Sequence, residues 1–358
     1  MLIDTVTLYR FSLPLTEPYK LAMGVVEAFD TVLAQIGDGE GGQGFGEATI
    51  LTGYTDETIG DCWAVARGLG KKIAGMEAAE AKELIQAEHA SHPFTATALM
   101  TAVEMLEGHP LLDVTGRTSV PLLAIINAMD EDAIAGEIEA RLEDGYSTLK
   151  VKVGFDAGAD LKRVGFIQDR VGDRALIRLD GNQGYGVEDA LGFVKGLKPG
   201  GIELFEQPCP ADDWDAAVTV AEAAGVPMML DESIYGPADI ERAADLRAAS
   251  YIKLKLMKAG GLEALAKGLK LIRERGMTPV LGNGVAGDPG CWMEACAARG
   301  LIGNAGEMNG FLKPKTGLFA EPIAVEGGAM ILETGRPKLK HPDTLATLAA
   351  ETVHYPES

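Results

Sequence analysis

Ionisable residues in the middle of the chain recur at the spacing of a repeating strand–helix unit. The gaps that join Lys152, Asp180, Glu206, Asp231 and Lys255 are 28, 26, 25 and 24 residues. One strand–helix–strand step takes about 30 residues or slightly fewer, and each of these positions follows a short apolar run. Because the C-terminal ends of barrel strands converge on one site, the spacing predicts three carboxylates side by side with lysines flanking them.

From residue 121 onward, short apolar runs alternate with helical patterns, which is typical of a closed parallel barrel. Helices are expected near 131–144 and 157–171. The expected strands are 122–127, a second ending at 153, a third ending at 180, a fourth ending at 206, a fifth ending at 231, then 251–256, 278–283 and an eighth near 304–307. The fold class is therefore α/β, a modified TIM barrel of the (β/α)7β type.

The first 118 residues show a different order of predicted elements. Alternating patterns at 2–15, 29–36 and 43–50 predict strands, and helical patterns follow at 79–91, 95–107 and from a cap at Thr55 to about Met76. Strands followed by helices indicate an α+β capping module. The tail from residue 320, which holds apolar runs at 323–325 and 329–332, is expected to return to that module. The predicted organisation is a cap at 1–118, a barrel at 119–318 and a C-terminal segment at 319–358.

Two glycine-punctuated segments of the cap, 19–25 and 49–55, carry aromatic and apolar side chains in loop context. Such loops can close over a site. Ordinary packing between domains explains them as well, and the sequence by itself slightly favours that alternative.

Composition excludes several classes of function. The formal net charge is −21, and an acidic chain repels nucleic-acid backbones and anionic membrane surfaces. No run of about 18 apolar residues could span a membrane, and no signal peptide is apparent. The four cysteines form no C-x-x-C pair, so reduced cysteines and a cytoplasmic location are expected.

The three carboxylates predict a metal. They would repel one another without a cation between them, and hard oxygen ligands with no nearby His or Cys suit Mg²⁺. We expect one Mg²⁺ per subunit, with Mn²⁺ able to substitute. Such an ion can hold a substrate carboxylate and stabilise the negative charge that develops when the α-proton leaves.

The lysines predict acid–base chemistry. Lys150 and Lys152 are two residues apart on one strand and so share a face, and Lys253 and Lys255 repeat that spacing on the far side. A cation or desolvation lowers the pKa of lysine toward that of a useful base. Lysines on opposite walls could act on opposite faces of a planar intermediate. All five histidines fall outside the expected barrel strands, so a histidine base in the barrel is not expected.

A glycine motif, Gly282-Asn283-Gly284-Val285-Ala286-Gly287, comes after the seventh expected strand. A dinucleotide fold would place such a motif on its first strand–helix turn, with an acidic residue about 20 positions later. The motif is therefore interpreted as a substrate-facing loop, and a nicotinamide-dependent oxidoreductase is a minor alternative.

The five spaced residues, in identity, order and spacing, resemble the enolase superfamily, specifically the muconate lactonizing subgroup of its muconate lactonizing enzyme and mandelate racemase family. The resemblance covers nearly the whole chain. It implies Mg²⁺ ligands at Asp180, Glu206 and Asp231, and acid–base roles for Lys152 and Lys255. It also implies that Lys150 tunes its neighbour and neutralises the substrate carboxylate, that Asn182 and Glu232 support the ligands, and that the loops near 19–25 and 49–55 form a lid. The family further implies a homo-oligomer, often an octamer.

Members of the subgroup share removal of a proton α to a carboxylate and differ in the fate of the resulting enolate. We expect a racemase or epimerase that acts through an enolate on a small amino-acid derivative of the proline, N-acyl or dipeptide type. The alternatives are a cycloisomerase, a dehydratase or a catalytically silent binder. Similar dipeptide epimerases carry Asp-x-Asp on the last strand, where this chain has Glu307-Met308-Asn309. The expected substrate contacts are Tyr19, Met23, Tyr54, Asp288, Trp292 and Glu307.

Overall fold

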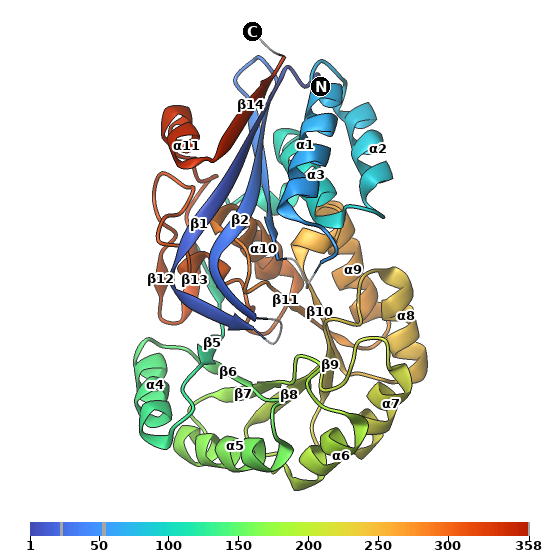
Figure 1. Ribbon diagram of the computed structural model, residues 1–358, viewed down its shortest axis with the longest axis vertical. Coiled ribbons are helices and arrows are strands. Elements are labelled where there is room, and N and C mark those ends of the chain that lie inside the picture. Colours follow the sequence, from blue (N-terminus) through green and yellow to red (C-terminus); the bar gives the residue numbers. More distant parts are fainter. Residues whose placement is uncertain (22–23, 52–54, 357–358) are drawn as a thin grey trace.

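The computed structural model describes residues 1–21, 24–51 and 55–356. The chain forms an antiparallel sheet with helices at one end and a ring of parallel strands enclosed by helices at the other (Figure 1). The N-terminus and the last described strand, which ends at Tyr355, lie at the end that carries the antiparallel sheet. Among the described residues, no helix is both long enough and apolar enough to cross a membrane.

The capping sheet has the order β14-β1-β2-β3, with every pair antiparallel. Its strands are β1 (Thr5–Leu21), β2 (Gly24–Gly37), β3 (Gln43–Ile50) and β14 (Glu351–Tyr355). Helices α1 (Ile59–Ile73), α2 (Ala78–Glu88) and α3 (Pro93–Leu106) share one buried apolar cluster with alternate residues of these strands. Period-2 burial in the strands and a buried helical stripe produce this two-layer core. The strands and helices predicted for this region are present.

The cap of α1 differs from the prediction. Thr58, not Thr55, precedes the helix, and its hydroxyl oxygen accepts a hydrogen bond from the Asp61 amide at 3.2 Å. The hydroxyl oxygen of Thr55 instead accepts from the Glu57 amide at 3.2 Å. Both threonines are good cap residues, so the sequence alone does not decide which of them precedes α1. The packing of the helix on the sheet decides it.

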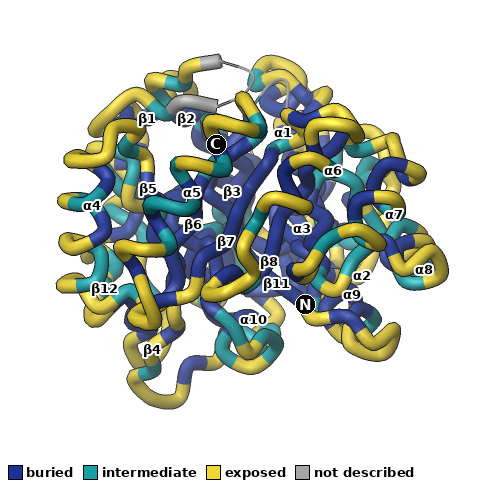
Figure 2. Tube along the Cα trace, turned by 90° about the horizontal axis from the view of Figure 1, so that it is seen from below, coloured by how far each residue is buried: buried dark blue, intermediate teal, exposed yellow. Residues whose placement is uncertain are grey.

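The barrel sheet has the order β11-β10-β9-β8-β7-β6-β5, with neighbouring strands parallel. Its buried strands lie inside a ring of helices whose outer faces are exposed (Figure 2). The strands are β5 (Ala124–Ile126), β6 (Thr148–Lys152), β7 (Leu176–Asp180), β8 (Ile202–Glu206), β9 (Met228–Leu230), β10 (Tyr251–Leu254) and β11 (Thr278–Leu281). The helices are α4 (Glu131–Glu143), α5 (Ala157–Val171), α6 (Val187–Gly196), α7 (Trp214–Ala223), α8 (Pro237–Leu246), α9 (Leu262–Glu274) and α10 (Asp288–Leu301).

The eighth predicted strand, near 304–307, is not a regular strand. Its residues nevertheless bridge the two edges of the sheet through backbone hydrogen bonds. Gly306 donates to Pro121 and accepts from Leu123, both at 2.9 Å, and the Glu307 amide donates to the Leu281 carbonyl at 3.0 Å. The buried Arg178 guanidinium adds a side-chain link, since it donates to the Ala305 carbonyl at 2.8 Å. The half-barrel is thus closed by a single extended segment.

The two apolar runs of the tail pair outside the capping sheet, and the tail reaches that sheet further along the chain. They form β12 (Val325–Glu326) and β13 (Ala329–Leu332), and β13 pairs with β4 (Thr118–Pro121). The hairpin turn contains Gly328, at φ +70°, whose added Cβ would lie 2.6 Å from a backbone atom of Gly145. After α11 (Pro342–Leu348), the tail returns to the cap as β14, which pairs with β1.

Candidate active site

A cavity of about 530 Å³ opens at the C-terminal ends of the barrel strands. Its walls combine strand-end residues of the barrel with two residues of the cap. The lining residues are Tyr19, Leu51, Lys150, Lys152, Asp180, Asn182, Gln183, Ala211, Asp231, Glu232, Tyr235, Lys253, Lys255, Met257, Asn283, Gly284, Val285 and Glu307. The cavity is large enough for a small organic ligand.

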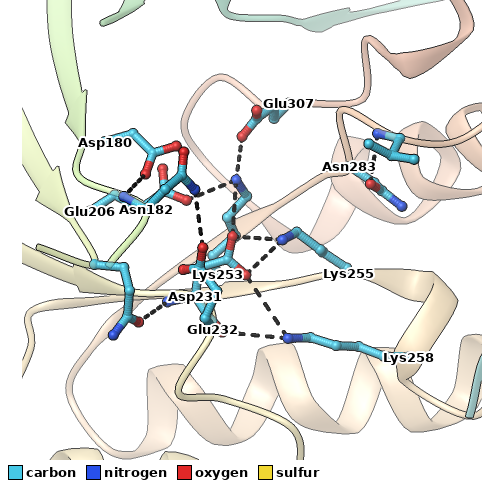
Figure 3. A network of polar contacts seen from close by, with 12 residues as sticks. Asp180, Asn182, Glu206, Asp231, Glu232, Lys253, Lys255, Lys258, Asn283 and Glu307 are labelled. Atoms are coloured by element: carbon cyan, nitrogen blue, oxygen red, sulfur yellow. Dashed lines mark hydrogen bonds and ion pairs between the residues drawn. The ribbon is translucent and has the colours of Figure 1, made fainter. Parts of the chain in front are cut away.

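Three carboxylates meet at the strand ends beneath this cavity, which form its floor, and two of them, Asp180 and Asp231, line it. Asp180 and Glu206 end neighbouring strands in direct register, and Asp231 comes directly after β9, the next strand. Lys150 lies between the first two, with its Nζ 2.8 Å from Asp180 Oδ2 and 2.9 Å from Glu206 Oε2. Lys253 Nζ lies 3.1 Å from Glu206 Oε1 and 3.5 Å from Asp231 Oδ2. Parallel strands in register therefore produce the cluster that the spacing predicted (Figure 3).

The charges of this cluster shift the pKa values of its members in opposite directions. Burial raises the pKa of Glu206 to about 7, and the neighbouring Asp180 adds to that shift. Burial would also raise the pKa of Asp180, but the ammonium groups of Lys150 and Lys152 outweigh it and lower the pKa to about 2. Burial therefore outweighs the two neighbouring ammonium groups at Glu206, whereas the ammonium groups outweigh burial at Asp180.

Lys152 and Lys255 occupy different walls. They come from β6 and from the residue after β10, with β7, β8 and β9 between them in the curled sheet. Lys152 Nζ lies 2.5 Å from Asp180 Oδ2, and Lys255 Nζ lies 2.8 and 2.6 Å from the two oxygens of Asp231. Burial disfavours the charge of Lys255, but Asp231 outweighs burial and leaves its pKa above the ordinary value.

The residues beside the carboxylates are tied together by side-chain hydrogen bonds. Asn182 Nδ2 donates to Glu232 Oε1 at 3.0 Å. Gln207 Oε1 accepts from the Asp231 amide at 3.1 Å and so fixes the loop that carries this carboxylate. Asn182 and Gln207 have φ values of +39° and +34°. Left-handed backbone at non-glycine residues is uncommon and clusters at functional sites.

Only some of the residues expected to contact substrate line the cavity. Tyr19 and Glu307 line the cavity, and Glu307 Oε2 accepts hydrogen bonds from Lys150, at 2.8 Å, and from Lys253. Met23 and Tyr54 lie outside the described residues. As a result, the segments 19–25 and 49–55 are described only in part.

The structure does not bring Asp288 or Trp292 to the cavity. The carboxylate of Asp288 accepts from the backbone amides of Leu318 and Phe319 at 2.7–2.9 Å. Trp292, one turn further along α10, packs with the rings of Phe45 and Phe319 in the core. Both side chains are buried by the contact between α10 and its neighbours, which no local sequence pattern reveals.

Sequence reasoning assigned no role to several residues that the structure brings to the site. Lys253 was noted only as the partner of Lys255 in spacing, yet its ammonium group contacts two of the three floor carboxylates. Lys258 is buried, with its Nζ 4.3 Å from the centre of the Tyr235 ring. Period-2 spacing pointed to Lys253, whereas no signal in the sequence pointed to Tyr235.

The floor carboxylates suit a divalent cation by their chemistry. They offer hard oxygen ligands on rigid strand ends, and Glu206 Oε2 is buried without a hydrogen bond, although Lys150 Nζ is near it. Within ranges 1–21, 24–51 and 55–356, no three His, Cys, Asp or Glu side chains converge closely enough to enclose an ion. Lysine ammonium groups lie between the carboxylates instead, so positive charge is supplied at the place where a cation would be needed.

Known proteins share this architecture and parts of this sequence. The family model described as enolase C-terminal domain-like matches residues 133–337. The L-Ala-D/L-Glu epimerase of Bacillus subtilis is 32% identical over 271 residues, which cover 72% of this chain and 74% of that protein. The N-succinyl-L-Arg/Lys racemase of Bacillus cereus is 26% identical over 283 residues, which cover 75% of this chain and 76% of that protein.

A solved structure extends the likeness to the whole fold. The dipeptide epimerase of Enterococcus faecalis, in complex with Mg and the dipeptide L-Leu-L-Tyr, superposes with a TM-score of 0.84 at 25% identity. The match covers 94% of this chain and 98% of that one. The cap and the barrel both take part in a match of this extent.

Proposed function

The chain belongs to the enolase superfamily, in its mandelate racemase and muconate lactonizing enzyme family, and we propose that it is a Mg²⁺-dependent racemase or epimerase of a small amino-acid derivative. The observation that carries the proposal is the pair Lys152 and Lys255 on different walls of one cavity, with three carboxylates between them. The epimerase and racemase names of its relatives support the same reaction class.

The two lysines are suited to a proton transfer that inverts one carbon. One lysine, as the neutral amine, takes the proton from the α-carbon, and the electron pair delocalises into the substrate carboxylate. The other lysine, as the ammonium, gives a proton to the opposite face. The ion held by Asp180, Glu206 and Asp231 would supply positive charge that favours this delocalisation. Lys150, buried beside two of those carboxylates, would add positive charge near the substrate carboxylate.

The shape and charge of the cavity support a compact substrate. The described lining residues away from the floor are mostly uncharged, including Tyr19, Leu51, Met257 and Val285. The carboxylate of Glu307 already accepts from two lysines, so it is only partly available to a positively charged nitrogen. We therefore propose a proline-type, N-acyl or dipeptide-like amino acid rather than a substrate with a large charged side chain.

The test is solvent deuterium uptake at the α-carbon, measured by NMR with Mg²⁺ over a panel of proline derivatives, N-acyl amino acids and dipeptides. Both stereoisomers of each compound are used. The wild type is expected to exchange and interconvert the stereoisomers of one class. Lys152→Ala and Lys255→Ala are each expected to abolish interconversion, because each removes one of the two proton carriers, at a cost of about 10²–10⁴-fold.

The product decides between the proposal and its alternatives. Loss of a β-substituent together with exchange would indicate a dehydratase on the same scaffold. Exchange of the same stereoisomer at the wild-type rate in both lysine variants would contradict the two-lysine mechanism. No exchange with any compound of the panel would refute the proposed substrate class.

A further inference from the structure

Glu294 lies behind the wall that carries Lys255. It is fully buried on α10, and its Oε1 accepts a hydrogen bond from the amide of Leu256 at 2.8 Å. Leu256 comes directly after Lys255, so this bond fixes the peptide unit that joins the two residues. Glu294 is not among the residues that line the 530 Å³ cavity. The hydrogen bond to Leu256 therefore connects Glu294 to the cavity through the backbone of Lys255.

A corresponding arrangement lies behind Lys152. The guanidinium of Arg163 contacts the Lys152 carbonyl and also lies 3.0 Å from Asp160 Oδ1. Asp160 is buried, and its Oδ2 accepts from the amides of Gly154 and Phe155 at 3.1 and 3.0 Å. The same oxygen accepts from the Asp156 amide and the Tyr185 hydroxyl. One carboxylate thus holds the loop after Lys152 from the side away from the cavity.

We propose that Glu294 and Asp160 are positioning residues, each for one lysine: Glu294 for Lys255 and Asp160 for Lys152. This inference rests on the proposed two-lysine function. A buried carboxyl oxygen that accepts a hydrogen bond from a backbone amide is a directional anchor. A lysine has four rotatable side-chain bonds, so the position of its ammonium group depends closely on the backbone that carries it. A displacement of about 1 Å can cost a reaction roughly 10²-fold.

The two anchors are independent in the fold. Glu294 joins α10 to the segment after β10, whereas Asp160 lies on α5 and acts on the segment after β6. Because each lysine serves one face of the substrate, loss of one anchor should affect one stereoisomer only. A residue that merely stabilises the fold would slow both stereoisomers together. This difference makes the inference testable.

The experiment measures α-deuterium exchange separately from each stereoisomer of a substrate that the wild type turns over. Lys152→Ala and Lys255→Ala first establish which stereoisomer each lysine serves. Glu294→Met keeps the side-chain length but removes the acceptor. We expect exchange on the Lys255 side to fall by about tenfold or more, with little change on the Lys152 side. Glu294→Gln retains an oxygen for the Leu256 amide and should restore the ratio.

Asp160→Asn is the mirror variant. The side-chain amide cannot accept both from the loop amides and from Arg163, so exchange on the Lys152 side should fall selectively. Glu104→Met is the matched control. Glu104 is a buried carboxylate on α3 that accepts from the amides of Leu262 and Glu263 at 2.6 and 3.0 Å. It holds the same segment further from Lys255, so its loss should lower the melting temperature without selectivity between stereoisomers.

The outcomes separate the two proposals. A wild type that exchanges neither stereoisomer would refute the proposed function itself. A wild type that exchanges both, with Glu294→Met slowing both equally, would overturn the positioning role of Glu294. The melting temperature of each variant, measured in parallel, identifies a variant that is unfolded. If Glu294→Met is unfolded, Glu294→Gln is compared with the wild type instead. A ratio of the two stereoisomers' exchange rates in Glu294→Gln that differs from the wild-type ratio would also contradict the role.

Discussion

Glu294→Gln should change how the stability of the protein depends on pH. Burial raises the pKa of the Glu294 carboxyl from 4.5 to about 8, and the hydrogen bond from Leu256 offsets only part of that shift. The folded chain therefore keeps this proton at pH values where the unfolded chain has lost it. The resulting stabilisation is fully present below pH 4.5 and disappears as the pH rises through about 8.

The magnitude depends on the width of that window. Each pH unit between the two pKa values changes the free energy of unfolding by about 1.4 kcal/mol. As the pH rises from 5.5 to 7.5, titration of Glu294 should therefore lower the free energy of unfolding of the wild type by up to roughly 3 kcal/mol. A glutamine does not titrate and shows no such loss. The free energy of unfolding of Glu294→Gln, relative to the wild type, should rise by that amount over the same range.

The assay is urea unfolding at pH 5.5, 6.5, 7.5 and 8.5, monitored by circular dichroism and by tryptophan fluorescence. Coincident transitions from the two probes are required before free energies are compared. Glu143→Gln, at an exposed position at the end of α4, serves as the control and should shift the curves little at any pH. Parallel pH profiles for Glu294→Gln and the wild type would refute the reasoning, because they would mean that the native carboxyl is already ionised.

Three further perturbations test other parts of the structure. Arg178→Met should lower the free energy of unfolding in urea by about 3–5 kcal/mol, since it removes a buried guanidinium and leaves the partly buried Glu203 carboxylate and the Ala305 carbonyl without their donor. Arg174→Met, which breaks an exposed ion pair, should have little effect, and equal losses would contradict the barrel-closing role. Glu206→Gln should weaken Mg²⁺ binding in calorimetry at pH 8 by at least about tenfold, and unchanged affinity would exclude it as a ligand. Gly282→Ala should lower the free energy of unfolding by about 1–3 kcal/mol, because φ is +141° and the new Cβ would lie 2.5 Å from the Glu307 amide nitrogen. An unchanged melting temperature would count against this packing.

Residues at strand ends were predictable because their contacts are set by a repeat. Asp180 and Glu206 end apolar runs 26 residues apart, and parallel strands in register bring such ends together whatever the intervening helix contains. The period-2 spacing of Lys253 and Lys255 likewise places both on one face of the sheet. Neither inference needs knowledge of how the cap packs.

Residues on helices and loops were less predictable. Asp288 and Trp292 come after a glycine-rich loop that does line the cavity at Asn283, Gly284 and Val285. Their own side chains are nevertheless taken up by contacts between α10 and the surrounding core. Thr55 and Thr58 are equivalent as caps in the sequence, and the packing of α1 on its sheet selects the second.

The sequence by itself therefore determined the parallel barrel, the cap and the line of ionisable groups at the strand ends, because each depends on a short period along the chain. Only the tertiary structure decided how the barrel closes, which side chains line the cavity, and how Glu294 and Asp160 hold the two lysines from behind. These contacts join segments far apart in the chain. They depend on the free energy of burying whole surfaces against one another, which no local pattern contains.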